Sequence, residues 1–128
     1  MAIDGRLKRQ AIESLSSVPG VFMHPASLVE DVYLLAYAFP EEQAFKAACA
    51  NTRRALEHLV DGAVTPSDLR HDFQGWKPCH YRHAVGQGTR ATCRIMCRNV
   101  PGGIEVKGFG HRRIPEDFYE RMRQAARP

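Results

Sequence analysis

The sequence contains no long hydrophobic run. No apolar stretch approaches the roughly 20 residues that a helix needs to cross a bilayer, so the pattern predicts no membrane partner. The first ten residues, Met1–Gln10, are polar and lack the apolar core of a secretion signal. We therefore expect a cytoplasmic protein whose four cysteines remain reduced rather than forming disulfides.

Internal repeats and low-complexity segments are also missing, which argues against repeat architectures and largely disordered chains. The chain is long enough for one domain, and its 44% hydrophobic and 25% charged residues are typical of a globular fold.

Acidic residues are scarce in the second half of the chain. Residues 1–69 carry 6 Lys/Arg and 9 Asp/Glu, a net charge of −3, whereas residues 70–128 carry 12 and 5, a net charge of +7. Arginine, which can grip a phosphate through two parallel hydrogen bonds, dominates the basic half. The segregation favours a polyanion such as nucleic acid as a partner, with a merely well-solvated surface as the alternative.

Apolar residues at helical spacing predict three helices in the first half of the chain, over residues 4–17, 26–39 and 41–60. Val21–Met23 is a short apolar run that fits an edge strand. Phe39-Pro40 separates the second and third helices by only a few residues, so we expect these two to form an antiparallel hairpin.

The second half reads as strands, with turns at Gly86–Gly88 and Val100–Gly103. The predicted strands and final helix cover residues 78–85, 90–98, 103–109 and 115–124. The sequence therefore predicts an α+β fold: an N-terminal helical hairpin packed on a three- to four-stranded antiparallel sheet, with a short C-terminal helix.

Several side chains in this half suit metal or phosphate. The cysteines and histidines are Cys79, His80, His83, Cys93, Cys97 and His111. Their spacing lacks the tight knuckle of structural zinc sites, so we predict no metal and no cofactor. Arg90, Arg94 and Arg98 recur every four residues, which on a regular strand places them on one face. That row of arginines is either a surface that binds a phosphate backbone or a solvated face of the sheet.

One stretch resembles a known family. Arg94–Arg98 leads into a Pro-Gly-Gly turn, Ile104–Val106 follows, and a Gly-His-Arg corner at Gly110–Arg112 precedes Phe118-Tyr119. This pattern resembles the RelE/ParE toxins of bacterial toxin–antitoxin systems and covers roughly residues 22–123. On this resemblance, residues 21–128 form a RelE-like toxin domain and residues 1–20 an N-terminal extension.

The resemblance implies an mRNA endoribonuclease that acts in the ribosomal A site, inhibits translation and is neutralised by an antitoxin protein. The ribose 2′-hydroxyl would attack the adjacent phosphate without a metal. Arg94, or alternatively Arg90, would face that phosphate, and Arg112 would stabilise the developing negative charge. His111 would act as general acid or base, and Tyr119 would stack on a base or help to move a proton.

The resemblance and the basic charge together give a wider set of RNA-binding candidates: Lys77, His80, Arg82, Arg90, Arg98 and Arg113. Each candidate has a structural alternative. Arginines can lie on a solvated sheet face, His111 can bond a turn, and Tyr119 can pack a helix on the sheet. Three other functions stay open: a ParE-like toxin that targets a type II topoisomerase, a non-catalytic nucleic-acid-binding module, or an interaction domain that uses its helical hairpin.

Overall fold

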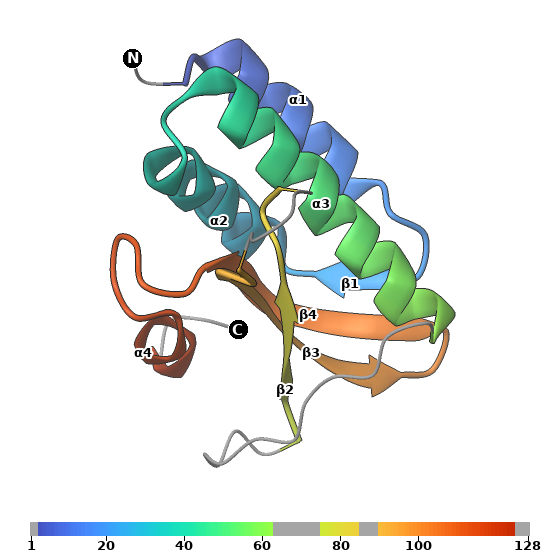
Figure 1. Cartoon of the computed structure of the whole chain (residues 1–128). Helices are drawn as coiled ribbons and strands as arrows, with labels where there is room; N and C mark the ends of the chain where they lie inside the picture. Colours follow the sequence, from blue (N-terminus) through green and yellow to red (C-terminus); the bar gives the residue numbers. More distant parts are fainter. Residues whose placement is uncertain (1–2, 63–74, 85–89, 125–128) are drawn as a thin grey trace.

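The computed structural model describes residues 3–62, 75–84 and 90–124, and within these ranges the fold is α+β as predicted (Figure 1). Its elements, in chain order, are α1 (Gly5–Ser16), β1 (Val21–Met23), α2 (Pro25–Ala38), α3 (Glu42–Asp61), β2 (Lys77–Tyr81), β3 (Cys93–Val100), β4 (Gly103–His111) and α4 (Phe118–Arg123).

The three N-terminal helices begin and end within a few residues of the predicted limits. Asp4 caps α1, because its side chain accepts a hydrogen bond of 2.9 Å from the Leu7 amide. Pro25 lies in the first turn of α2, where its missing N–H is not needed. Gly62 ends α3 with a φ of 73°, a left-handed conformation that favours glycine. Local chain chemistry therefore sets these boundaries.

The sheet has the order β1-β4-β3-β2. The pairs β2–β3 and β3–β4 are antiparallel as predicted, whereas the edge strand β1 runs parallel to β4, so the sheet is mixed. No tight turn joins β1 to β4: α2, α3 and two further strands separate them along the chain, and such a connection permits a parallel pair. The predicted turn at Gly86–Gly88 lies outside the described residues.

The two faces of the sheet are covered by different helices (Figure 1). The side chains of Cys93, Ile95 and Cys97 belong to the main core that also contains buried residues of α1, α2 and α3. Met96 points to the opposite face, where it packs with Phe118 and Met122 around α4. Alternation along β3 thus assigns even-numbered residues up to Met96 to the α4 face.

The α4 helix starts at Phe118 rather than at the predicted Pro115, because the Asp117 carboxylate caps it by accepting from the Tyr119 and Glu120 amides. Glycines in β4 let this helix approach the sheet. A Cβ at Gly108 would lie 2.6 Å from the Met122 sulfur, and one at Gly110 would lie 2.9 Å from an Arg121 nitrogen. The two glycines therefore allow α4 to pack closely against β4.

The N-terminal helix shares the main core with the rest of the chain. Leu15 of α1 and Val18, which follows it, are buried in the same cluster as α2 and α3 residues. None of the helices in the described ranges combines the length and hydropathy needed to cross a membrane.

Candidate functional site

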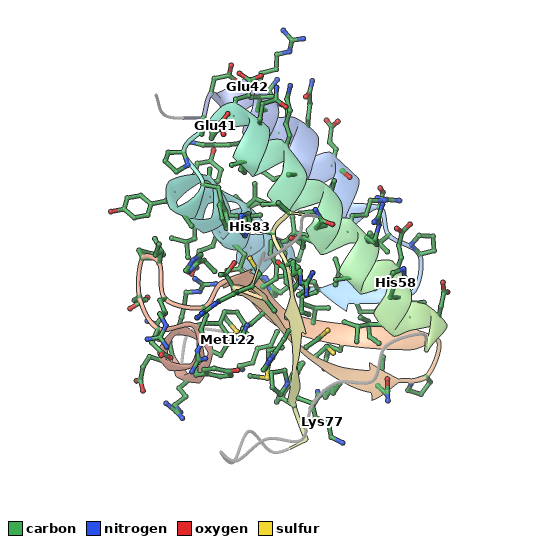
Figure 2. All side chains as sticks on the ribbon, viewed as in Figure 1. Glu41, Glu42, His58, Lys77, His83 and Met122 are labelled. Atoms are coloured by element: carbon green, nitrogen blue, oxygen red, sulfur yellow. The ribbon has the colours of Figure 1, made fainter. Side chains whose placement is uncertain are left out.

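Basic side chains gather where β2, β3 and β4 lie in register. His80 of β2 pairs with Arg94 of β3, and Arg94 pairs with Gly110 of β4. Residues directly opposite one another project to the same face, so His80 and Arg94 both point to the α4 side of the sheet. His111 and Arg112 follow at the end of β4. Figure 2 labels Met122 of α4 and Lys77, the first residue of β2, two elements that border this region.

Arg94 supplies a buried positive charge. Its side chain is only 5% exposed, and its Nη1 donates to the carbonyls of Ala91 at 2.7 Å and Cys93 at 2.9 Å. Its buried Nε has no hydrogen-bond partner among the residues that the structure describes. A buried guanidinium with one donor unused suits an anionic ligand.

His111 closes the turn that follows β4. Its Nδ1 accepts hydrogen bonds from the amides of Arg113 at 3.0 Å and Ile114 at 3.1 Å. Because Nδ1 accepts, the neutral ring carries its proton on Nε2. Partial burial, and then the charges of His83, Arg94 and Arg113, lower the pKa of His111 below 6.5. His111 is therefore a neutral hydrogen-bond donor at pH 7, which suits a contact to phosphate better than removal of a proton.

Arg112 is held between the sheet and α4 by its backbone. Its amide donates to the Thr92 carbonyl at 2.8 Å, and its carbonyl accepts from the Phe118 amide at 2.7 Å. Its Nε is buried and makes no hydrogen bond within the described ranges. Arg112 thus resembles Arg94, because each is a cation whose buried Nε has no hydrogen-bond partner among the described residues.

His80 is a titratable group on which both of these cations act. Partial burial, then Arg94 and then Arg112, lower its pKa below 6.5. The imidazole is exposed on β2, and no hydrogen bond to a described residue occupies its ring nitrogens. At neutral pH it is uncharged and has a nitrogen ready to accept a proton. His80 therefore fits the role of general base better than His111 does.

The predicted arginine row is not uniform, because β3 begins only at Cys93. Arg90 precedes the strand and is exposed, whereas Arg94 is buried. Arg98 is exposed and already engaged: its Nε and Nη2 lie 2.6 and 2.5 Å from Glu105 Oε1, and its guanidinium lies 4.2 Å from the centre of the Trp76 ring.

The remaining predicted residues lie around this cluster. Tyr119 is half-buried, meets Phe118 edge-on at 5.6 Å and packs against the cluster of Met96, Phe118 and Met122. The structure brings together His80, Arg94 and Arg112, whereas His111 pairs with Cys93 and so points to the main-core face, where its ring lies 5.7 Å from that of Phe39. The other predicted RNA-binding residues that are exposed, besides Arg90 and Arg98, are Lys77, Arg82 and Arg113.

Sequence reasoning missed two basic residues of α3 that face the edge strand β2 across a groove. Arg54 and His58 line a groove beside β2. They are one helical turn apart in the predicted helix over residues 41–60, and this spacing was the available signal.

The cysteines and histidines are divided between the two faces. Cys79, Cys93 and Cys97 are buried in the main core, whereas His80 points to the other face. Within the described ranges, no three His, Cys, Asp or Glu side chains are grouped to hold a metal ion.

Comparisons with models of protein families, with curated proteins and with solved structures found no match to this chain. The RelE/ParE resemblance therefore stays a prediction.

Proposed function

We propose that the chain is a toxin-type mRNA endoribonuclease that cleaves by attack of a ribose 2′-hydroxyl on the adjacent phosphate. The observation that carries this proposal is the register of His80 and Arg94, with the charge of Arg112 acting on the same imidazole. The arrangement places a neutral proton acceptor, His80, near two cations, Arg94 and Arg112, whose buried Nε atoms have no hydrogen-bond partner among the described residues. The RelE/ParE resemblance and the net charge of +7 over residues 70–128 support the same class of substrate.

The proposed reaction needs no oxidant or second substrate. A ring nitrogen of His80 takes the proton of the 2′-hydroxyl as the 2′-oxygen bonds to phosphorus. Arg94 and Arg112 stabilise the extra negative charge on the non-bridging oxygens. The bond from phosphorus to the 5′-oxygen breaks, and that oxygen takes a proton from solvent. The products are a 2′,3′-cyclic phosphate and a 5′-hydroxyl.

The wider biological setting rests on the resemblance. The substrate would be mRNA in the ribosomal A site, the chain would act in the cytoplasm and inhibit translation, and an antitoxin protein would neutralise it. An acidic antitoxin segment that folds on binding would complement the basic half of the chain.

The proposal is tested with purified ribosomes stalled on a short mRNA. Wild-type protein should release fragments that end in 2′,3′-cyclic phosphate and 5′-hydroxyl groups, and a 2′-deoxy substitution at the cut site should abolish that cut. His80→Gln should slow cleavage by about 10²–10⁴-fold, the usual range for loss of a general base. Arg9→Gln, an exposed change on α1, is the matched control and should cleave like the wild type.

Two other outcomes would point elsewhere. Growth arrest in cells without any RNA cleavage would favour the topoisomerase-targeting toxin. Salt-dependent RNA binding without cleavage would favour a non-catalytic module, in which the arginines contact phosphates only.

A further inference from the structure

A groove of about 240 Å³ lies between α3 and β2 and adjoins the candidate site. We call it the α3–β2 groove; the residues used below are Arg54, Ala55 and His58 of α3, His80 and Tyr81 of β2, and Arg82. Figure 2 labels His58 on the later half of α3, and Figure 1 shows β2 running toward the middle of that helix.

Four basic residues line the groove from both sides. Arg54 and His58 are four residues apart and share one face of α3, while His80 and Arg82 are two residues apart on the strand side. Arg54, His58 and Arg82 are exposed and make no ion pair with a described residue. No Asp or Glu of the described chain lines the groove. Its charge is thus complementary to an anion.

The floor of the groove is apolar. Ala55 and Tyr81 are buried, so their side chains present carbon surface between the cations rather than an open polar surface. An apolar floor with a cationic rim suits a nucleotide, whose base needs an apolar surface and whose phosphate needs cations.

The groove also borders the strand that carries the proposed general base. His80 is among the residues that line the groove, whereas its imidazole points with Arg94 to the opposite face, so the groove and the candidate site lie on the two sides of one edge strand. Because β2 is the last strand in the order β1-β4-β3-β2, no other described strand closes the groove on that side.

We propose that the α3–β2 groove binds the nucleotide adjoining the cleaved phosphodiester of a single-stranded RNA. The inference rests on the proposed nuclease function and assigns a substrate-binding role to Arg54 and His58. Arg54 contacts the flanking phosphate and thereby sets the direction in which the strand crosses His80 and Arg94. An acidic peptide would satisfy the cations but gives no reason for the apolar floor or for the position of the groove beside the strand that carries His80.

The test measures binding of a fluorescent, fully 2′-O-methylated RNA oligonucleotide, which cannot be cut by 2′-hydroxyl attack, to the full chain. Fluorescence anisotropy over a series of salt concentrations gives the affinity and its salt slope. Arg54→Gln should weaken binding about tenfold and reduce the salt slope by about 0.7, the change for one lost phosphate contact on a single strand. Arg9→Gln should leave both unchanged, and equal unfolding midpoints exclude a folding defect.

Three results would overturn the assignment. Arg54→Gln could bind RNA like the wild type, the wild type could fail to bind the oligonucleotide, or Arg54 could be needed only for binding a polyglutamate peptide. The last result would identify an acidic protein segment as the occupant. Because cleavage on ribosomes is measured separately, failure of the groove assignment leaves the nuclease proposal to be judged by its own assay.

Discussion

Nη2 of Arg121 lies 3.4 Å from Oδ1 of Asp31, and both side chains are almost completely buried, at 1% and 0% exposure. The same pair brackets the backbone of Phe109: Arg121 Nη2 donates to its carbonyl at 2.9 Å, and Asp31 Oδ2 accepts from its amide at 2.9 Å. The pair therefore ties α2 and α4 to the strand that ends at His111, two residues later.

Removal of Asp31 should destabilise the fold strongly. Asp31→Ala would leave the Arg121 charge buried without its carboxylate, which typically lowers the free energy of unfolding by about 3–5 kcal/mol. Urea unfolding followed by circular dichroism measures the change. Glu13→Ala, an exposed acidic residue on α1, should change stability by no more than about 0.5 kcal/mol. A loss below about 1 kcal/mol for Asp31→Ala would contradict the importance of the ion pair.

The close packing of α4 against Gly108 gives a second stability prediction. The added methyl group of Gly108→Ala would overlap the buried Met122 side chain and lie 3.0 Å from Asp31 Oδ2, so we expect a loss of about 1–3 kcal/mol. Gly5→Ala is the control, because a Cβ there meets nothing within 4 Å.

A double mutant separates this overlap from a general backbone effect. Met122→Ala removes the side chain that the new methyl group meets, so Gly108→Ala should cost less in that background than in the wild type. Strictly additive losses in calorimetry or urea unfolding would mean that contact with Met122 is not the cause.

The sequence predicted the elements well because their signals are local. Pro25, the Phe39-Pro40 break and the Pro-Gly-Gly turn each act within a few residues. The parallel direction of β1 was not predictable, because it depends on pairing between Val21–Met23 and Ile104–Val106, which are far apart in the chain. The start of α4 was misplaced because Pro115 competed with Asp117 as the start signal.

The candidate site was only partly accessible from the sequence. Period-two alternation correctly makes Arg94 and Arg98 equivalent on a strand, but it cannot show that α4 covers one part of the face or that Glu105 neutralises Arg98. The pairing of His80 with Arg94 depends on strand register, and the approach of Arg54 depends on helix packing. Local spacing places Arg54 and His58 on one helix face, but it shows neither the strand register nor the neighbour of that helix face.

The cysteines should react slowly while the chain is folded. Burial raises the pKa of Cys49 to about 12, that of Cys93 to about 11 and that of Cys97 to about 12. Very little thiolate forms at pH 8, and the thiolate is the reactive species. A thiol reagent such as Ellman's reagent should therefore label these residues much more slowly in buffer than in denaturant. Equal rates in the two conditions would contradict the buried assignment.

The titration of His80 should report the two nearby cations. Partial burial and the charges of Arg94 and Arg112 lower its pKa, so its proton should leave below pH 6.5 when followed by NMR. Arg112→Gln removes one positive charge and should move the pKa upward, toward 6.5, because protonation is then opposed less. Arg123→Gln has the same charge change on α4 and should leave the titration unshifted. An unchanged His80 pKa in Arg112→Gln would contradict the electrostatic effect of Arg112 on His80.

The most direct test of the nuclease account is primer extension on a reporter mRNA after brief induction in translating cells. Wild-type protein should produce discrete cuts inside translated codons, Arg112→Gln should lose those cuts while keeping a native circular dichroism spectrum, and Arg9→Gln should retain them. Absence of cuts with the wild type, or unchanged cuts with folded Arg112→Gln, would contradict the central claim that the His80–Arg94–Arg112 cluster cleaves mRNA.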